Sequence, residues 1–589
     1  MPSIPSNTAT PSNTAIAEAL EELGDLYELD GAVVHRVLAY RAAARSVREA
    51  ANSVATLAAA GRATELPGIG ATIQDKINAL SEAGVIPAAE RLRAKFPPGL
   101  VALTRLHGLG PKRARLLYDE LGIDSLEALR DAAVAQRLRT VRGLGPKFEA
   151  NVLAAIEAGA ATAGQQRLLL PDALEVAGTL IEGLAADAPQ DARLEVAGSA
   201  RRGVESVKDI DLVATTAEPE RLAGCLAGLE QIASVGSSGA AGARARTHAG
   251  VGVDLRIAAP PQHGNLLQHF TGSGAHNAAL RERVVRRGLH VSEYGILDDA
   301  SGDTATYAEE AAVYEHLGLF FIPPELREDR GELDAAAPGG TGLPGLVQER
   351  DIRGDLHCHT VASDGRAGIE EMAEAARERG YEYLAFTDHS ASHGFGNAVS
   401  AGELRRQIER IREADAKLDG IELLAGSEVN VLPDGSLDYD DELLRELDWV
   451  IASVHTAFNM AEDNMTARMV TAVEHPLVDA IGHPTGRLIG RRPPYALDVG
   501  RLIEAAAASG TMLEINANPR RRDLSEVHAR AAVAAGVLVV VDSDAHAPAT
   551  LANMRWGIST ARRAWLGPQD VANTRPWSEL APLRKRARV

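Results

Sequence analysis

The spacing of apolar residues divides this 589-residue chain into regions of different secondary structure. From Thr14 to about Ala160, apolar residues recur every three or four positions, which predicts amphipathic helices. From about Leu168 to Ile322 the pattern mixes helices with strands, and strands are expected at Leu194–Gly198, Ile210–Thr215 and Val251–Ala258. The amino-terminal stretch, rich in Ser, Thr, Pro and Asn, predicts a disordered tail.

A different rhythm begins after Ala335–Gly345, a stretch rich in Gly, Pro and Ala that predicts a linker. Short apolar runs then alternate with helical segments, at Tyr383–Phe386, Leu423–Ala425, Trp449–Ala452, Met512–Ile515 and Val537–Val541. Such alternation is typical of βα units and favours a parallel sheet or barrel. The final residues, Arg584 to Arg588, predict a basic tail.

The composition indicates a soluble protein of several domains. A hydrophobic content of 45% and a mean hydropathy of −0.10 fit a globular chain, and its length exceeds what one core can organise. The sequence shows neither an apolar run that could span a bilayer nor an export signal. Two cysteines, Cys225 and Cys358, exclude a disulfide framework, so we expect a cytoplasmic protein.

The net charge of −20 is unevenly distributed. Residues 1–170 hold 19 Lys and Arg against 18 Asp and Glu, a net charge of +1. Residues 171–330 hold 14 against 24, and residues 331–589 hold 28 against 39. Because polyanion binding depends on local patches, the total charge does not exclude a nucleic-acid partner.

A Gly-apolar-Gly turn followed by a helical pattern occurs three times in the helical region. Such a turn exposes backbone N–H groups at the positive end of a helix, lets a phosphate approach closely, and here precedes Lys112 and Lys147. One copy is equally compatible with a plain turn between packed helices. Three copies favour helix-hairpin-helix binding of DNA. The glycines are Gly68, Gly70, Gly108, Gly110, Gly143 and Gly145.

Three aspartates in the mixed region predict a magnesium site. Asp209 and Asp211 are two residues apart on an expected strand and so point to one face, and Asp254 lies on another strand. Clustered carboxylates repel one another unless cations neutralise them, and an all-oxygen site suits two Mg²⁺ ions that act on phosphates. Asp-x-Asp alone is often a solvated strand edge, but the preceding block Gly198–Gly203 makes phosphoryl transfer the more specific interpretation.

From about Asn13 to Ile322, these motifs, in this order, resemble DNA polymerase beta and the bacterial family X polymerases. The resemblance implies that the three aspartates bind two metal ions and that Asp254 helps to activate the primer 3′-hydroxyl. It also implies that Ser199 and Arg202 contact the triphosphate of an incoming deoxynucleoside triphosphate.

The segment from Phe270 to Arg281 is similar to the nucleotide-sensing segment of the same family. The resemblance implies that Gly272 permits close approach of the sugar, that Asn277 contacts the incoming base, and that Arg281 contacts the template minor groove. His269 departs from the tyrosine of polymerase beta, so discrimination against ribonucleotides is left open.

The amino-terminal segment also resembles the 5′-deoxyribose-phosphate lyase domain of the beta-type enzymes, with Lys76 at the position of the Schiff-base lysine. His35 and Tyr40 match that domain, whereas Thr64 and Thr72 stand where it has phosphate-binding lysines. A lysine nucleophile requires a depressed pKa. Lyase activity and an ordinary surface lysine both stay open as interpretations.

The densest chemical signal is a series of histidines and acids where expected strands end. His357 and His359 are two residues apart on a strand, which aims both rings to one side and turns Cys358 into the core. Ends of parallel strands carry the active sites of βα barrels, and mixed imidazole and carboxylate ligands suit Zn²⁺, Mn²⁺ or Fe²⁺. A single histidine is more often a solvated or core residue, but six at strand ends favour a site with two or three ions.

Over roughly residues 351–560, this pattern resembles the PHP (polymerase and histidinol phosphatase) domain. The resemblance implies a distorted (β/α)₇ barrel and a metal-activated hydroxide that attacks phosphorus. In bacteria this domain occurs fused to family X polymerases, where it supports 3′–5′ exonuclease, apurinic/apyrimidinic endonuclease and 3′-phosphatase activities. The metal ligands that it implies are His357, His359, Asp364, His389, Glu428, His455, His483, Asp544 and His546.

The sequence thus predicts a monomeric DNA-directed DNA polymerase that fills gaps in base excision repair on gapped or primed DNA at the nucleoid, coupled to a metal-dependent 3′ nuclease or phosphatase. One alternative is a repair nuclease or phosphatase whose polymerase half positions DNA. A DNA-binding scaffold with an inactive barrel conflicts with the complete ligand set, and a small-molecule phosphatase leaves the hairpins unused.

The chain is expected to divide into seven parts and a linker. They are a disordered tail (1–14), a helix-hairpin-helix domain resembling the lyase domain (15–95), a helix-hairpin-helix DNA-binding subdomain (96–165), an α+β nucleotidyltransferase palm of the polymerase beta type (166–262), a nucleotide-sensing subdomain (263–325), a linker (326–350), the PHP barrel (351–575) and a basic tail (576–589).

Overall fold

The computed structural model describes residues 11, 13–50, 53–104, 109–141, 143–146, 148–150, 152–153, 156, 167–394 and 397–585. The chain forms two compact units. The first contains Met1–Leu168, Glu175–Glu195 and Lys208–Pro260, and the second contains Leu169–Leu174, Val196–Val207 and Pro261–Val589. Within the described residues, no helix combines the length and the apolar character needed to cross a membrane.

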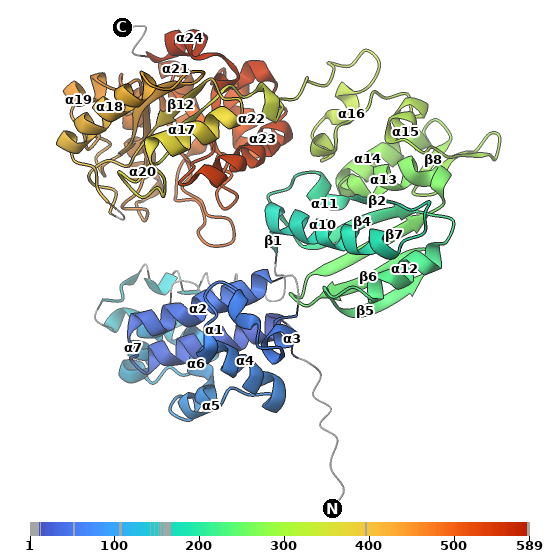
Figure 1. The fold of residues 1–589 in the computed structure, drawn as a ribbon, viewed down its shortest axis with the longest axis horizontal. Coiled ribbons are helices and arrows are strands. Elements are labelled where there is room, and N and C mark those ends of the chain that lie inside the picture. Colours follow the sequence, from blue (N-terminus) through green and yellow to red (C-terminus); the bar gives the residue numbers. More distant parts are fainter. Residues whose placement is uncertain are drawn as a thin grey trace, which may run out of the picture. The chain divides into compact units, whose positions relative to one another are not determined.

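The amino-terminal part of the first unit is helical, as the spacing of its apolar residues predicts (Figure 1). Leu20, Leu23 and Leu26 lie on one face of the first helix and are fully buried in a core shared with the following helices. Asn13 begins this helix instead of belonging to a disordered tail, and its side chain bonds Ala50 and Val54. The helices are α1 (Asn13–Leu29), α2 (Val34–Glu49), α3 (Val54–Ala59), α4 (Ala71–Ala83), α5 (Pro87–Arg93), α6 (Pro98–Thr104), α7 (Pro111–Leu121) and α8 (Leu126–Val134).

A five-stranded mixed sheet of order β2-β4-β7-β6-β5 completes the first unit. Its strands β4 and β7 run parallel, whereas β5, β6 and β7 are antiparallel neighbours. The three strands expected from the sequence are present, although Gly198 begins a helix instead of ending a strand. The elements are α10 (Leu170–Asp187), β2 (Arg193–Val196), β4 (Asp209–Thr215), α12 (Pro219–Ala227), β5 (Ile232–Gly239), β6 (Gly242–Thr247) and β7 (Gly252–Ala258).

The second unit begins with a small α+β region built around a buried arginine. Arg327 is fully buried, pairs with Glu310 at 2.5 Å, and places its guanidinium over the rings of Tyr314 and Phe321. This arrangement neutralises the buried charge and fixes the region around it. The elements are β1 (Leu168–Leu169), α11 (Gly198–Arg201), β3 (Ser206–Val207), α13 (His263–Thr271), α14 (Gly274–Val285), β8 (Leu289–Ser292), β9 (Gly295–Asp298), β10 (Thr304–Ala305), α15 (Glu310–His316) and α16 (Glu332–Ala335).

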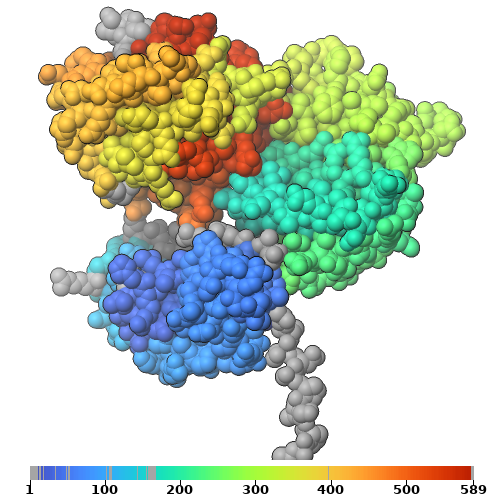
Figure 2. Space-filling model, viewed as in Figure 1, coloured from blue at the N-terminus to red at the C-terminus, as the bar shows by residue number. Residues whose placement is uncertain are grey.

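The expected linker around Ala335–Gly345 is packed, which corrects the interpretation of its small residues as a flexible connection. Ala336 is fully buried, and its carbonyl accepts a bond from the Phe320 N–H at 2.8 Å. A Cβ on Gly340 would lie 2.1 Å from the Asp334 carbonyl oxygen. The small residues therefore permit close packing of the chain here. In Figure 2 the surface of this region (yellow-green) meets that of the barrel (yellow to red).

The carboxy-terminal part is a barrel of seven parallel strands in sequence order, β11 to β17, as the βα rhythm predicts. A parallel bridge between Cys358 and Ala545 joins the first strand to the segment after the last. The strands are β11 (Gly354–Cys358), β12 (Tyr383–Phe386), β13 (Glu422–Asn430), β14 (Trp449–Ser453), β15 (Ala480–Ile481), β16 (Met512–Asn516) and β17 (Val539–Asp542). The helices around them are α17 (Ile369–Glu378), α18 (Ala401–Asp415), α19 (Asp441–Arg445), α20 (Glu462–Glu474), α21 (Val499–Ser509), α22 (Glu526–Ala534), α23 (Met554–Arg563) and α24 (Trp577–Leu580).

The first residues of the expected basic run, Arg584 and Lys585, are bound to the barrel instead of forming a free tail. The Lys585 ammonium donates to the carbonyls of Val473 and His475 at 2.6 and 2.7 Å, at the end of α20. Burial lowers the pKa of Lys585 to about 8. Arg584 lies over the Trp577 ring, so both cations have structural partners. The remaining residues, 586–589, lie outside the described residues.

Candidate metal centres

Nine imidazole and carboxylate side chains converge at the carboxyl ends of the barrel strands. His357 belongs to β11 and Glu428 to β13, and the other seven follow the ends of β11, β12, β14, β15 and β17. Parallel strands end at one rim of a barrel, so residues distant in sequence meet there. The nine are the residues that the resemblance to the PHP domain implies as metal ligands. They are His357, His359, Asp364, His389, Glu428, His455, His483, Asp544 and His546.

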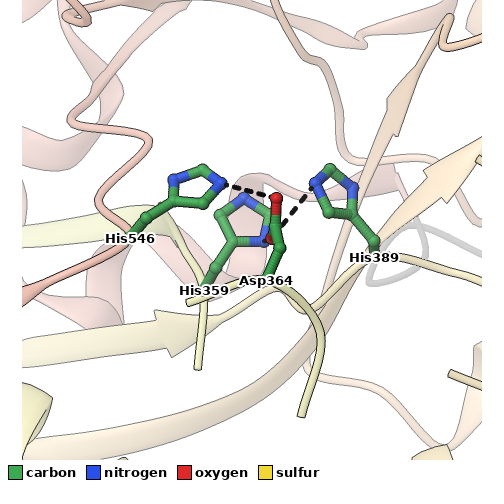
Figure 3. Close-up of side chains that lie close together, drawn as sticks. All are labelled: His359, Asp364, His389 and His546. Atoms are coloured by element: carbon green, nitrogen blue, oxygen red, sulfur yellow. Dashed lines mark ion pairs between the residues drawn. The ribbon is translucent and has the colours of Figure 1, made fainter. Parts of the chain in front are cut away.

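One group of four side chains lies toward the rim of the barrel. Figure 3 shows His359, Asp364, His389 and His546, whose ligand atoms lie within 4.8 Å of one another. Oδ2 of Asp364 is 3.3 Å from Nε2 of His546, and Oδ1 is 3.5 Å from Nε2 of His389. Three nitrogens and a carboxylate thus face one small space.

Two further groups share members with the first. One joins His357 and His359 to Asp544, and the other joins His389 to Glu428 and His455. Nε2 of His359 is 3.2 Å from Oδ1 of Asp544, and Nδ1 of His389 is 2.8 Å from Oε2 of Glu428. Shared histidines and a central glutamate are typical of a site that holds more than one ion.

Glu428 also contacts His483, the remaining histidine of the nine residues. Its Oε1 is 2.9 Å from Nε2 of His483 and 3.2 Å from Nε2 of His455. Burial raises the pKa of this carboxyl, but the imidazoles of His455, His389 and His357 hold it well below its usual range. Burial lowers the pKa of His483 to about 3. An ionised carboxylate beside a neutral imidazole is the state that binds divalent cations.

The donor atoms of the cluster fit divalent cations. Among the residues that the structure describes, Nε2 of His357, both ring nitrogens of His359 and Oε2 of Glu428 are buried without a hydrogen-bond partner. Burial alone would lower the pKa of His357, yet the charges of Glu514, Glu428 and Asp544 raise it well above its usual value. Unpaired buried donors and acceptors are costly, and coordination to a cation would satisfy them. The nitrogen and oxygen donors fit Mn²⁺, Zn²⁺ or Fe²⁺.

Two buried side chains on β16 support the cluster, and sequence reasoning missed both. Glu514 accepts a 2.6 Å bond from Nδ1 of His357 and a 2.5 Å bond from the His483 N–H. The Asn516 amide donates to Oδ2 of Asp544 at 3.1 Å. Such partners fix the orientation of metal ligands. A glutamate inside the apolar run Met512–Ile515 was the signal available in the sequence.

A cavity of about 510 Å³ opens onto the cluster, and two arginines line it beside the acidic side chains. Arg366, Arg521 and Asn518 line it together with several of the nine residues. Nε of Arg521 is 3.4 Å from Oδ2 of Asp544. Guanidinium groups beside a metal cluster favour an anionic substrate such as a phosphate ester.

Cys358 and Asp388 adjoin ligands in sequence but do not join the cluster. Cys358 is fully buried in the hydrophobic core, as the alternation of the strand predicts, and its Sγ donates to the Ala385 carbonyl. Asp388 accepts bonds from the Thr360 N–H and Oγ1 at 2.8 and 2.7 Å, and from Ser363. Asp388 therefore shapes the loop after β11.

The three aspartates of the first unit lie on one face of two adjacent strands. In the pairing of β4 with β7, Asp211 is opposite Asp254, and Ile210 between the first two aspartates is fully buried. The face shared by Asp209 and Asp211 thus agrees with the sequence pattern. Asp254 pairs with Arg244 and Arg256 at 3.2 and 2.8 Å. Among the described residues, the ligand groups that come within 4.8 Å do not include these aspartates.

Arg202, expected at a triphosphate, has partners inside the second unit. Its Nε is 2.9 Å from Oε1 of Glu328, and Nη1 donates to the Thr271 carbonyl at 2.9 Å. Ser199 lies within α11 and is half-buried. Glu328 was not singled out from the sequence, because no local pattern marks a partner 126 residues away.

The nucleotide-sensing segment is internally bonded. The Asn277 amide donates to the His269 carbonyl at 2.6 Å and accepts from Gln268. A Cβ on Gly272 would lie 2.6 Å from Oδ1 of Asn277, so a larger residue would have to displace the Asn277 side chain. Arg281 is exposed on α14.

The glycine turns are described in part. Gly68 has φ +78° and Gly70 caps α4, while Gly110 directly precedes α7. Gly143 has φ +87°, and helical residues follow Gly145. Gly108, with Lys147, lies outside the described residues. The described turns have the positive φ or the helix start that the motif requires.

Lys76 lies on α4 with its ammonium group 5.7 Å from the centre of the Tyr40 ring. Its Nζ donates to the Thr72 carbonyl at 3.3 Å. Lys76 thus has structural partners on α2 and on its own helix.

Family models match four parts of the chain. The helix-hairpin-helix domain matches residues 11–86, and the SAM-like helix-hairpin-helix tandem matches residues 100–158. The DNA polymerase beta thumb matches residues 266–328, and the PHP domain matches residues 355–518.

The chain is also similar to curated proteins. It is 36% identical over 579 residues to the DNA polymerase/3′-5′ exonuclease PolX of Bacillus subtilis (strain 168), a match that covers 97% of this chain and 99% of that protein. It is 34% identical over 204 residues to a probable phosphatase of Caldanaerobacter subterraneus subsp. tengcongensis, covering 33% of this chain and 75% of the phosphatase. A probable phosphatase of Thermoanaerobacter sp. (strain X514) is 31% identical over 232 residues, covering 37% of this chain and 89% of that protein.

Proposed function

Because the chain belongs to the bacterial family X DNA polymerases that carry a PHP domain, we propose that it fills gaps in DNA during base excision repair and processes 3′ ends in its barrel. Similarity over 97% of the chain to a polymerase/exonuclease supports both activities together. The convergence of nine histidine, aspartate and glutamate side chains at one rim is the observation that carries the barrel half. A 3′–5′ exonuclease, an apurinic/apyrimidinic endonuclease and a 3′-phosphatase all use this chemistry.

In the barrel, the nine side chains would hold two or three Mn²⁺, Zn²⁺ or Fe²⁺ ions. Bound divalent cations supply Lewis acidity, which lowers the pKa of a water molecule and neutralises charge that develops on phosphate. The Glu514 carboxylate keeps the His357 ring in place by accepting a bond from the Nδ1–H of that ring. Arg521 and Arg366 line the cavity and bind the phosphates of the DNA end.

In the polymerase half, Asp209, Asp211 and Asp254 would hold two Mg²⁺ ions, and Asp254 would accept the proton of the primer 3′-hydroxyl. The shared face of β4 and β7 supports this assignment. Asp254 must then exchange its arginine partners for a cation.

The incoming deoxynucleoside triphosphate would be bound by residues of the second unit. Ser199 and Arg202 would contact the triphosphate, so Arg202 must share its guanidinium between the nucleotide and Glu328. The bonds of Asn277 to the end of α13, next to Gly272, support a role of this segment in sensing the base and sugar. Exposed Arg281 would contact the template.

The glycine turns would grip the DNA backbone without reading its sequence. Gly68, Gly70, Gly110, Gly143 and Gly145 offer backbone N–H groups at helix starts to phosphates. A gapped or primed duplex is thus the proposed substrate, and the protein would act on it as a monomer. A chromosomal substrate implies action in the cytoplasm, at the nucleoid.

Two double variants test this assignment against its main alternative. Asp209→Ala with Asp211→Ala should abolish nucleotide incorporation on gapped DNA while Mn²⁺-dependent trimming of 3′ ends continues. His357→Ala with His359→Ala should abolish trimming and leave incorporation, so each variant is the control for the other. If the wild-type chain trims DNA but incorporates nothing, the protein is a repair nuclease whose polymerase half positions DNA.

A further inference from the structure

The barrel binds the backbone of the segment that carries the proposed triphosphate ligands. Directly after α11, the Arg202 carbonyl accepts a 2.9 Å bond from Nη1 of Arg563, the last residue of α23 (both helices are labelled in Figure 1). The next carbonyl, of Gly203, accepts from Nη1 of Arg522 at 3.0 Å and from the Ser559 hydroxyl at 3.3 Å. Three barrel side chains outside the ligand set therefore hold this turn.

The turn fits against α23 only with glycine at its centre. Gly203 has φ +69°, and a Cβ there would lie 2.4 Å from the Ser559 hydroxyl oxygen. Arg522 is 2% exposed, and its Nε donates to Thr560 on the same helix at 2.8 Å. A buried guanidinium with fixed partners holds a defined position, so it constrains the carbonyl that it binds.

One carboxylate oxygen connects the barrel to the Arg202 side chain. Oε1 of Glu328 is 2.9 Å from Nε of Arg202 and 2.9 Å from Nη1 of Arg563. The Arg563 side chain is 4% exposed, and its Nη2 also pairs with Glu526 at 3.1 Å. Charges that are shielded from water interact strongly. Arg563 therefore fixes both the backbone of Arg202 and the carboxylate that orients its guanidinium.

We propose that Arg563, a residue of the nuclease barrel, is a positioning residue for nucleotide binding by the polymerase half. It holds the turn after α11 so that Ser199 and Arg202 face the triphosphate. Without it, Glu328 would pair with Arg202 alone and withhold that guanidinium from the nucleotide. The inference rests on the proposed polymerase function and adds to it that the barrel supports incorporation independently of its own metal cluster.

Single-nucleotide incorporation on gapped DNA by the full chain tests this proposal. Arg563→Gln should raise the KM for the deoxynucleoside triphosphate about tenfold, the effect expected from losing bonds to charged groups, and leave kcat unchanged. Trimming of 3′ ends should be unchanged, because Arg563 touches none of the nine ligand side chains. Arg563→Lys keeps the charge beside Glu328 but not the full set of bonds, so its KM should lie between those of the wild type and of Arg563→Gln.

Arg562→Gln is the matched control. Arg562 lies on the same helix and pairs with Glu325 at 2.7 Å and with the Val347 carbonyl, but it does not bond the turn after α11. Its KM should equal that of the wild type. An equal rise in KM in the Arg562 variant, or a wild-type KM in both Arg563 variants, would overturn the proposal.

The melting temperature of each variant separates positioning from folding. If Arg563→Gln has a lower melting temperature than the wild type, the KM of Arg563→Lys is the test. A positioning role predicts that this KM is raised although the variant melts at the wild-type temperature. A wild-type chain that incorporates no nucleotide would refute the proposed polymerase function itself. Incorporation by the wild type with an unchanged KM in the Arg563 variants refutes only the present inference.

Discussion

Replacing Glu514 by glutamine measures how much a residue outside the ligand set contributes to metal binding. Glu514 is fully buried and accepts bonds of 2.6 Å from His357 and 2.5 Å from the His483 N–H. Glutamine fills the same volume, but it is neutral and turns an NH₂ group toward one of these donors. Losing a bond to a charged group costs about 1.5–3 kcal/mol, or roughly a 10- to 100-fold loss in metal affinity.

The assay is a titration of metal-free protein with Mn²⁺, followed by the signal of free Mn²⁺ in electron paramagnetic resonance. Glu514→Gln should bind Mn²⁺ more weakly by that factor and regain wild-type trimming at saturating Mn²⁺. Asp542→Asn is the matched control, because Asp542 is a buried carboxylate on β17 whose Oδ1 accepts only from the Leu356 N–H in the described contacts, and asparagine keeps that acceptor. Unchanged affinity in the Glu514 variant, or an equal loss in the control, would refute the reasoning.

Three further predictions concern DNA binding in the cavity, the pH dependence of metal binding, and a buried ion pair outside the barrel. Arg521→Gln should raise the KM for DNA in trimming about tenfold without lowering metal content, since it removes a phosphate-binding cation from the cavity; unchanged kinetics would contradict this. Burial lowers the pKa of His546, but the carboxylate of Asp364 outweighs it and raises that pKa to about 9. Because a cation that binds this imidazole must displace its proton, the affinity for Mn²⁺ should fall as the pH drops from 9 to 7. Titrations that are independent of pH over this range would refute that assignment. Glu332→Gln removes one partner of a fully buried pair with His276 at 2.6 Å and should lower the melting temperature in calorimetry by about 5 °C. An unchanged melting temperature would contradict a stabilising role of this pair.

The parts of the fold that could be predicted are those with a local periodic signal. Apolar runs of four or five residues located β12, β14 and β16, because fully buried parallel strands leave such runs in the sequence. The same signal located candidate residues at the strand ends, since parallel strands of a barrel end at one rim, and the resemblance to the PHP domain implied which nine of them are metal ligands. The domain boundaries drawn from the sequence stay predictions.

The wrong predictions were those that inferred the packing of a segment from its composition alone. Gly340 and Ala336 looked like a linker, yet small residues serve close packing as readily as flexibility. Lys585 looked like part of a basic tail, and only the fold reveals the carbonyls at the end of α20 that it binds. Glu514 and Arg563 were missed for a related reason. Their partners are distant in sequence, and a single sequence carries no record of such pairs.

The central claim is that this chain carries two separate metal sites, one of carboxylates and one rich in histidine. Elemental analysis of purified protein tests it most directly. The wild type and the Asp209→Ala, Asp211→Ala double variant should each contain about two or three transition-metal ions per chain, as the shared ligand groups of the barrel require. His357→Ala with His359→Ala should lower this value below one. A wild type with well under one ion per chain, or equal metal loss in both double variants, would contradict the account.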